Sequence, residues 1–306
     1  MEITSGMVRD LREKTGAGLM DCKAALSAAG GDMEAAIDHL RRKGLAAAAK
    51  KSSRIASEGV VCAHVDGAVG SLVELNCETD FVARTDEFTA LAGEVAALVN
   101  AAAPADVSAA LELSTGGVPL RDRLAEKVGK IGEKISLRRF ARIGVPAGEP
   151  GMVVPYIHGG GKIGVLVAVT GAGASNAAAA SAAKDLAMQV AAANPSWVGR
   201  ADVPAQVIEH EKSIYREQAK ASGKPDKILD KIAEGKLEKY FADFCLLEQA
   251  FIKDPDRKVK QYLADAGKAA GAQIAVRSFA RFQVGEGLEK RSDDLAAEVA
   301  KQLGQG

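Results

Sequence analysis

Residues 74–84 read Glu-Leu-Asn-Cys-Glu-Thr-Asp-Phe-Val-Ala-Arg, and they place an aspartate and a phenylalanine side by side where an alternating strand pattern has just ended. Connections of this kind often carry functional side chains on a rigid scaffold. In one interpretation Phe81 packs back beneath its own helix, and Asp80 caps a turn. In the other, Phe81 is a rigid apolar wedge with an adjacent charge, suited to opening a packed site in another protein. The residues alone leave both interpretations open.

Side chains that could catalyse a covalent reaction are not grouped in this sequence. The four histidines are dispersed, no serine stands in a Gly-x-Ser-x-Gly motif, and no pair of carboxylates stands out among the 26% charged residues. The cysteines show neither Cys-x-x-Cys spacing nor a nearby histidine set that could bind zinc. We therefore expect buried or half-buried reduced thiols at Cys22, Cys62, Cys77 and Cys245. A binding protein is favoured over an enzyme.

Two glycine-rich stretches resemble nucleotide-binding motifs but depart from them. In residues 170–176 the third glycine of a dinucleotide fingerprint is replaced by Asn176, and no acidic residue follows at the required distance. In His158-Gly-Gly-Gly-Lys-Ile163 the residue after Gly-Lys is not the Ser or Thr of a phosphate-binding loop. We interpret the first stretch as a strand-to-helix turn and the second as a hairpin turn with His158 near its tip. No cofactor is expected, although a nucleotide-cofactor enzyme stays a minor alternative.

The charge and length of the chain limit the kinds of partner. It has 306 residues, 47% of them hydrophobic, which suffices for about two structural units with packed cores. Its 40 basic and 40 acidic residues cancel, so nothing favours general binding to nucleic acid or to an anionic membrane. The first residues lack the pattern of a secretory signal, and no apolar run is long enough to span a membrane. We therefore expect a cytoplasmic protein that recognises its partner locally.

The first segment is predicted to be a small helical module. Apolar positions at helical spacing, with glycines between them, predict three helices over residues 3–14, 19–28 and 32–43, the last capped by Asp32. Its expected core positions are Met7, Val8, Leu11, Ile37 and Leu40. Residues 45–58 are interpreted as a helical or flexible linker. Three short helices make a marginal core, which is more typical of a docking unit than of an enzyme.

Beyond the linker the sequence repeats itself. Alternating strands joined by turn residues are predicted at 60–65 with 69–75, and again at 152–157 with 163–170; helices follow at 86–100 and 177–193. The closing strands align without a gap, Ile-Ser-Leu-Arg-Arg-Phe-Ala-Arg-Ile at 135–143 against Ile-Ala-Val-Arg-Ser-Phe-Ala-Arg-Phe at 274–282. The sequence therefore predicts two strand-strand-helix-strand units, each an antiparallel sheet covered by helix, in an α+β fold.

The second unit contains an insertion. Two polar helical patterns in residues 204–243, joined by Ser-Gly-Lys-Pro at 222–225, predict a helical hairpin or a short antiparallel coiled coil. Periodicity alone extends its second helix to about residue 252, but Lys253-Asp-Pro255 breaks the pattern at once, and the alternative is that this run packs as irregular chain. Further helices are predicted at 255–267 and, with Ser292 as cap, at about 292–303.

The stretch at 74–84 resembles the signature of elongation factor Ts, the bacterial guanine nucleotide exchange factor for elongation factor Tu, and residues 11–26 resemble that family's amino-terminal signature. His158-Gly, Asn194-Pro and residues 282–290 extend the resemblance over essentially the whole chain. It implies a ubiquitin-associated-like module and linker at 1–54 and core subdomains at 55–145 and 146–285. It also implies the inserted hairpin in the second subdomain and a carboxy-terminal helical module at 286–306. Ala250 stands where the family commonly has proline, which leaves the conformation after the hairpin open.

The resemblance also implies a function and a set of contact residues. The chain is expected to bind elongation factor Tu in its GDP-bound and nucleotide-free states, to disturb the magnesium and phosphate site so that GDP leaves, and to be displaced by GTP. An exchange loop is implied at Thr79, Asp80, Phe81 and Val82, and further partner contacts at Arg12, Met20, Lys23, His158 and Gly159. A homodimer or a two-to-two complex is possible within the family, as is a one-to-one complex. The alternative is a docking scaffold that binds a GTPase without affecting nucleotide release.

Overall fold

The computed structural model describes residues 3–289, which form an α+β fold with two three-stranded antiparallel sheets, as predicted, and two short two-stranded pairs. The first sheet has the order β1-β2-β5 and the second has the order β10-β7-β6. The strands are β1 (Glu58–Asp66), β2 (Val69–Cys77), β5 (Ser136–Gly144), β6 (Gly151–His158), β7 (Ile163–Thr170) and β10 (Ala275–Gln283). Both predicted hairpins and both predicted closing strands are thus confirmed.

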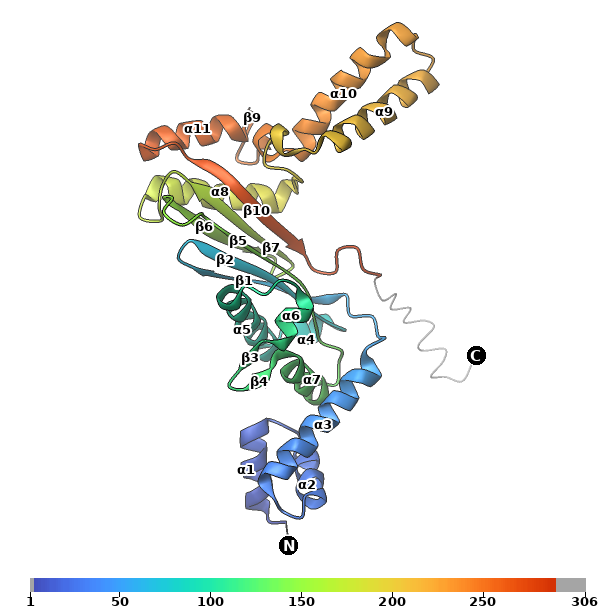
Figure 1. Ribbon diagram of the computed structural model, residues 1–306, viewed down its shortest axis with the longest axis vertical. Helices are drawn as coiled ribbons and strands as arrows, with labels where there is room; N and C mark the ends of the chain where they lie inside the picture. Colours follow the sequence, from blue (N-terminus) through green and yellow to red (C-terminus); the bar gives the residue numbers. More distant parts are fainter. Residues whose placement is uncertain (1–2, 290–306) are drawn as a thin grey trace.

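The two sheets pack face to face, and one long helix covers the outer face of each (Figure 1). Helix α5 (Asp86–Ala102) buries its apolar side on the first sheet, and α8 (Ala177–Ala193) does the same on the second. Between the sheets lies a cluster to which both contribute: Val61, Leu72, Val145, Val153, Leu166 and Ala168. The layers therefore run helix, sheet, sheet, helix.

The internal repeat extends to the contact between the sheets. Gly70 of β2 faces Val153, and Gly164 of β7 faces Val61, so closely in each case that a Cβ on the glycine would overlap the valine. The strand pairing makes these positions equivalent in the two halves, because Val61 pairs with Glu74 and Val153 with Ala168. The sheets therefore meet through an approximate twofold relation in which small residues permit close approach.

A three-helix region precedes the first sheet. Its helices are α1 (Ser5–Thr15), α2 (Leu19–Ala28) and α3 (Met33–Lys51), and they enclose a small core around Leu11, Cys22 and Leu26. Asp32 caps α3 by accepting a hydrogen bond from the Ala35 amide at 2.8 Å, as predicted.

Helix α3 is longer than the sequence predicted, because it continues to Lys51 and absorbs the first half of the expected linker. It packs on α7 (Leu120–Ile131), where Gly44 lies against the backbone of α7 and Gly129 lies against Gly44. Arg41 forms an ion pair across this contact with the buried Asp122. The extension is thus stabilised by a partner far away in the sequence.

The segment between α5 and β5 was not assigned from the sequence. It contains α6 (Val107–Glu112), a two-residue strand pair β3 (Ser114–Thr115) and β4 (Val118–Pro119), and then α7. Leu120, Leu124 and Val128 of α7 are buried in the core of the first sheet at helical spacing, so the apolar pattern of α7 was present in the sequence.

The insertion in the second half forms two packed helices that project from the body of the molecule (Figure 1). They are α9 (Ala205–Ala221) and α10 (Leu229–Phe244), with single 3-10 turns at η1 (Arg200–Asp202), η2 (Asp226–Ile228) and η3 (Leu246–Glu248). At their base Glu248 contacts Arg200, Lys258 and Lys260. The hydrogen bond from Lys258, together with those from Arg200 and Lys260, lowers the pKa of Glu248 to about 2 despite burial.

The predicted extension of α10 to residue 252 is wrong. The helix ends at Phe244 because the Phe244 carbonyl oxygen accepts hydrogen bonds from the amides of Ser196 and Trp197, at 2.9 and 3.1 Å. The chain then enters η3 and the short strand β8 (Ala250–Phe251), which also fixes the conformation around Ala250.

The predicted helix at 255–267 begins too early. Residues from Asp254 to Lys258 form β9, which pairs with β8, and α11 runs over Val259–Ala270. The Gln261 side chain accepts a hydrogen bond from the Lys258 amide at 2.8 Å, which marks the start of the helix. The helix predicted at about 292–303 lies outside the described residues.

The two glycine-rich stretches are turns, as predicted. Residues 171–176 join β7 to α8, and Asn176 caps α8 by accepting a hydrogen bond from the Ala179 amide at 3.1 Å. Residues 159–162 join β6 to β7. The four thiols are free; three are buried and Cys62 is partly buried.

Candidate functional site

The exposed turn, residues 79–82, begins directly after β2. Asp80–Ala83 form a one-turn helix, α4, and Thr79 caps it by accepting a hydrogen bond from the Val82 amide at 3.3 Å. Phe81 is 81% exposed, more than any other large apolar side chain among the described residues. The interpretation in which Phe81 packs beneath its own helix is therefore wrong, and so is the capping role given there to Asp80. Asp80 instead pairs with Arg84 at 2.7 Å.

The inner side of α4 explains why Phe81 points outward. Ala83 is buried in the core of the first sheet, and Val82 packs against the same core. The Thr85 hydroxyl donates to the Val82 carbonyl at 2.8 Å and accepts from the Phe88 amide at 3.3 Å, so it joins α4 to the start of α5. With Val82 and Ala83 held inside, a single helical turn directs residue 81 into solvent.

The end of β2 is held by Cys77, whose thiol donates to the Thr79 carbonyl at 3.1 Å. Burial, reinforced by the nearby charge of Glu133, raises the pKa of Cys77 to about 12. The thiol therefore stays protonated near neutral pH and serves as a hydrogen-bond donor rather than as a nucleophile.

His158 and Gly159 lie in the turn between β6 and β7. The His158 ring is exposed and stacks on Tyr156, with Nδ1 at 3.1 Å from the tyrosine hydroxyl. Lys162 pairs with Glu58 at 2.5 Å. Because Glu58 stands opposite Cys77 in the β1–β2 pair, the β6–β7 turn and the exposed turn lie at the same end of the two sheets.

Arg12, Met20 and Lys23 lie on the three-helix region, which is separate from both turns (Figure 1). All three side chains are exposed, and Met20 is 72% exposed next to the exposed Leu19. The structure therefore divides the predicted contact residues into two surfaces. One comprises residues 79–82 with His158 and Gly159; the other comprises Arg12, Met20 and Lys23.

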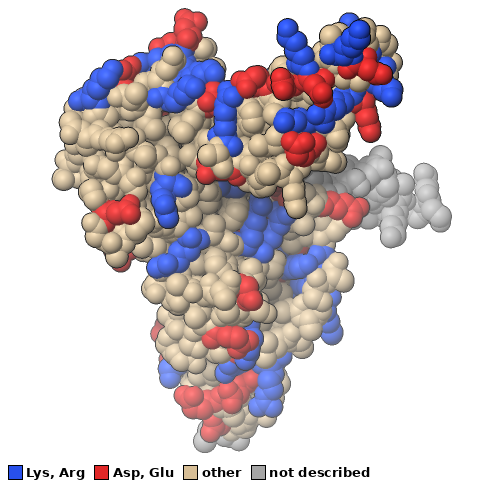
Figure 2. Space-filling model, turned by 45° about the horizontal axis from the view of Figure 1, so that its top comes forward, with Lys and Arg blue, Asp and Glu red and all other residues tan. Residues whose placement is uncertain are grey.

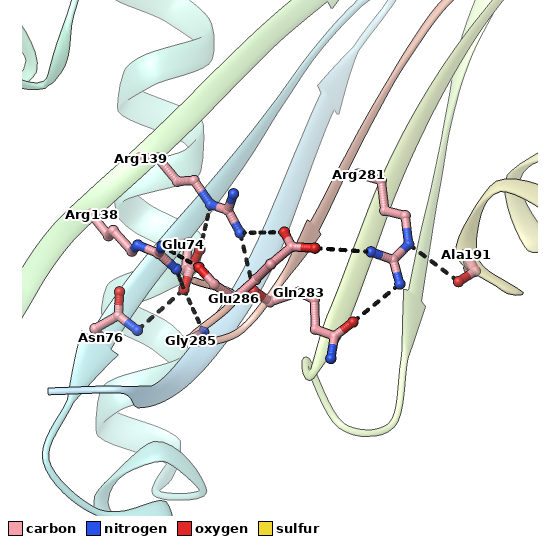
Figure 3. A network of polar contacts seen from close by, with 9 residues as sticks. All are labelled: Glu74, Asn76, Arg138, Arg139, Ala191, Arg281, Gln283, Gly285 and Glu286. Carbon is pink, nitrogen blue, oxygen red and sulfur yellow. Dashed lines mark hydrogen bonds and ion pairs between the residues drawn. The ribbon is translucent and has the colours of Figure 1, made fainter. Parts of the chain in front are cut away.

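A buried charge network holds the first sheet to the chain that follows the second (Figure 3). Glu74 of β2 is fully buried and accepts hydrogen bonds from Arg138 at 2.9 Å, from Arg139 at 2.5 Å and from the Gly285 amide at 2.8 Å. Burial alone would raise the pKa of Glu74, but the Gly285 amide and the two guanidinium groups outweigh it and lower the pKa. The carboxylate is therefore charged at neutral pH and fixes residues 283–286 beside β5.

The face of the molecule drawn in Figure 2 carries charges of both signs rather than a field of one sign. Figure 2 shows Lys and Arg interspersed with Asp and Glu on the face in view, most clearly over α9 and α10, where Arg216 pairs with Asp230. Across residues 3–289, no group of three or more His, Cys, Asp or Glu side chains is placed to hold a metal ion. None of the helices in that range combines the length and apolar character needed to cross a membrane.

Glu78 and Glu133 were not singled out in the sequence. Glu133 accepts hydrogen bonds from the amides of Glu78 and Thr79, and Glu78 accepts one from the amide of Lys134. No local pattern could have identified Glu133, because its partners lie 54 and 55 positions away.

Comparison with known proteins identifies the class to which the chain belongs. A family model described as Elongation factor TS matches residues 78–286. The proteins called Elongation factor Ts from Magnetococcus marinus, Syntrophotalea carbinolica and Clostridioides difficile are each 48% identical to the chain, over 98% of its length and 99% of theirs. These matches define a translation elongation factor, active in protein biosynthesis. The chain belongs to the elongation factor Ts family.

Proposed function

We propose that this protein is a guanine nucleotide exchange factor for elongation factor Tu. It binds the GDP-bound and nucleotide-free forms of that GTPase, disturbs the site that holds magnesium and phosphate, promotes GDP release and is then displaced by GTP. No covalent chemistry and no cofactor are required, so the protein is not an enzyme in the usual sense. Family membership over nearly the whole chain supports this proposal.

The exposure of Phe81 is the observation that carries the proposal. A phenylalanine that is 81% exposed on a turn fixed at Thr79, Val82 and Ala83 has no role in the core of this protein. Exposed apolar groups of this kind gain free energy when a partner buries them. We assign Phe81 the role of the wedge and Asp80 that of biasing a polar network near the magnesium ion.

The proposed mechanism is thermodynamic linkage. Phosphate contacts and a magnesium ion with near-octahedral coordination hold GDP, so a small displacement of the surrounding elements weakens the hold on both. If the factor lowers GDP affinity by a given ratio, GDP must lower the affinity for the factor by the same ratio. Returning nucleotide therefore expels the factor and completes the cycle.

The remaining contact residues are assigned to docking. Arg12, Met20 and Lys23 would hold the three-helix region on the GTPase, and His158 with Gly159 would contact it from the β6–β7 turn. The location of His158 and Gly159 at the same end of the sheets as Phe81 supports a shared surface. Since Met20 and Phe81 are on separate parts of the chain, binding and displacement would be divided between two surfaces.

We propose a division into four parts: a ubiquitin-associated-like module with linker at 1–54, subdomains at 55–145 and 146–285, and a carboxy-terminal module at 286–306. The three-helix region and the two three-stranded sheets support the first three parts. The helices α9 and α10 would form an antiparallel coiled coil inserted in the second subdomain. This arm would extend the partner surface or support a homodimer or two-to-two complex. Because its proposed partner acts in translation, we propose a cytoplasmic location.

The test is stopped-flow release of a fluorescent GDP analogue from elongation factor Tu, with and without catalytic amounts of this protein. Exchange activity predicts strong acceleration that saturates with factor concentration. A docking scaffold predicts binding to the GTPase with an unchanged release rate. That second result, obtained with a folded sample and a matched partner, would refute the exchange function.

A further inference from the structure

The Glu133 carboxylate binds the backbone at the start of the exposed turn. Glu133 follows α7 and accepts hydrogen bonds from the amides of Glu78 and Thr79 through Oε2, at 3.1 and 3.0 Å. Its Oε1 accepts from the Thr79 hydroxyl at 2.6 Å. The same hydroxyl accepts from the Val82 amide, so Glu133 also fixes the orientation of the residue that caps α4.

The contact is reciprocal, and we name the four residues 78, 79, 133 and 134 the carboxylate clasp. While Glu133 accepts from the amide of Glu78, the Glu78 carboxylate accepts from the amide of Lys134 at 2.7 Å. Hydrogen bonds to an ionised acceptor are about twice as strong as neutral ones. Because each carboxylate accepts a hydrogen bond from a backbone amide of the other segment, the pair fixes the distance between residues 78–79 and residues 133–134.

The clasp lies where three segments converge. Arg54, from the connection after α3, pairs with the Glu78 carboxylate at 3.2 Å, and its carbonyl accepts from the Lys134 side chain at 2.9 Å. Because α3 and α7 pack on each other and both lead into this region, the clasp connects the three-helix region to the turn that carries Phe81. A side chain that displaces elements of its partner by small distances must itself be held rigidly, and the clasp holds the turn that carries Phe81.

We infer that Glu133 is a positioning residue for exchange: through its hydrogen bonds to the Thr79 amide and hydroxyl it fixes the direction of Phe81. This inference rests on the proposed exchange function. The role predicts that loss of Glu133 reduces the maximal rate of nucleotide release, because Phe81 is no longer held in one direction. The half-saturating concentration should change little, because docking through Met20 and its neighbours is unaffected. It also predicts that Glu133 has no effect on exchange once Phe81 is absent.

The experiment is a double-mutant cycle in the stopped-flow assay, with release rates measured over a range of factor concentrations. Glu133→Ala is expected to lower the maximal rate about 10-fold and to leave the half-saturating concentration within about twofold. In a Phe81→Ala background the same substitution should change the maximal rate by less than about twofold. Glu133→Gln keeps an oxygen for the two amides and should recover most of the rate.

The matched control is Glu94→Ala, which removes an exposed glutamate that pairs with Arg123 of α7 but does not contact the clasp. Its release kinetics should equal those of the unaltered protein. An unchanged maximal rate in Glu133→Ala would overturn the inference. So would an equal reduction in both backgrounds, because a merely structural residue acts independently of Phe81.

A second measurement keeps the inference separate from the proposed function. Hydrogen exchange at the amides of Glu78, Thr79 and Val82 should accelerate at least about 10-fold in Glu133→Ala but not in Glu94→Ala. If the unaltered protein does not accelerate GDP release, the proposed function fails, whereas amide exchange still tests the clasp. If Glu133→Ala does not fold, Thr79→Val removes only the hydroxyl, and an unchanged maximal rate in that variant counts against the clasp.

Discussion

Replacing Phe81 by alanine tests the proposed wedge with little disturbance of the free protein. The ring is 81% exposed and has no packing partner that its removal would leave with a cavity. Substitutions at such positions change the free energy of unfolding by about 0.5 kcal/mol or less. Any larger effect on nucleotide release must therefore arise in the complex with the partner.

The size of the effect follows from the area that the ring can bury. A phenylalanine side chain presents about 200 Å², and the exposed share of Phe81 corresponds to about 160 Å². At about 25 cal/mol per Å² this gives an upper limit of about 4 kcal/mol. Only the part that is stronger in the transition state for release accelerates it. We therefore expect a loss of about 1.4–2.8 kcal/mol, or 10- to 100-fold in the maximal rate of GDP release.

The assay compares Phe81→Ala with two other exposed apolar residues. Met20→Ala on the three-helix region should raise the half-saturating concentration and leave the maximal rate unchanged. Ile252→Ala, 40% exposed in the turn between β8 and β9, should alter neither quantity. If Phe81→Ala retains the maximal rate at saturating concentration, the ring is not a wedge, and the proposed mechanism is wrong at its central residue.

Three further predictions concern the stability of the scaffold, measured by urea denaturation. Ala103 ends α5 with a left-handed backbone at φ 49°, and the equivalent Asn194 ends α8 at φ 45°. Ala103→Gly should therefore raise the free energy of unfolding by about 0.5–1 kcal/mol, and Asn194→Ala should lower it by a similar amount. A loss of stability in Ala103→Gly would contradict the reasoning. Glu74→Gln should cost about 3 kcal/mol at neutral pH. Because folding lowers the pKa of Glu74, its contribution is fully present above the ordinary carboxylate pKa and is lost progressively as pH falls through the lowered folded-state pKa. A difference in the free energy of unfolding that does not shrink as the solution is acidified below about pH 4 would count against the network. Gly164→Val should cost about 3 kcal/mol or more because the added side chain overlaps Val61, and Val61→Ala in the same chain should restore part of that loss.

The sequence predicted the repeated framework well because its pattern is local. The alignment of residues 135–143 with 274–282 placed both closing strands within a residue of their observed bounds. It also aligned Arg138 with Arg277, and each of these lies at the irregularity in the pairing of its strand. Alternation and turn residues carry this information within a few positions, so no knowledge of distant contacts was needed.

The wrong boundaries occur where distant contacts decide the local structure. Helix α3 continues beyond its predicted end because it packs on α7. Helix α10 ends before residue 252 because the Phe244 carbonyl accepts hydrogen bonds from the amides of Ser196 and Trp197. The apolar residues that continued the helical period beyond residue 244 pack elsewhere: Phe251 is buried in the core of the second sheet, and Leu247 packs against that core. Periodicity alone could not separate one buried helix face from two consecutive burial sites.

At the candidate site the sequence identified the exposed residues but not their support. The position of Phe81 after a strand, outside any periodic run, raised two alternatives, and its exposure excludes the one in which the ring packs beneath its own helix. Glu133 gave no local signal, since a carboxylate after a helix is common on protein surfaces. Its role became visible only when the fold placed it beside residues 78 and 79.

The two halves share an arginine contact near the end of the long helix. Arg142 donates from β5 to the carbonyl of Asn100 near the end of α5, and the equivalent Arg281 donates from β10 to the carbonyl of Ala191 near the end of α8. A guanidinium at a helix carboxyl end is favourable in either half, so this contact belongs to the shared scaffold.

The connection between the second strand and the long helix is different. In the second half residues 171–176 form a plain turn, whereas in the first half the corresponding connection contains α4 and Phe81. Beside it, the buried Glu74 of the first half has Ala168 as its equivalent. Because shared stability needs are met by features that both halves possess, a feature present in only one half requires another explanation. The one-turn helix and the clasp behind it are such features, and this asymmetry independently supports a partner-directed role for the exposed turn.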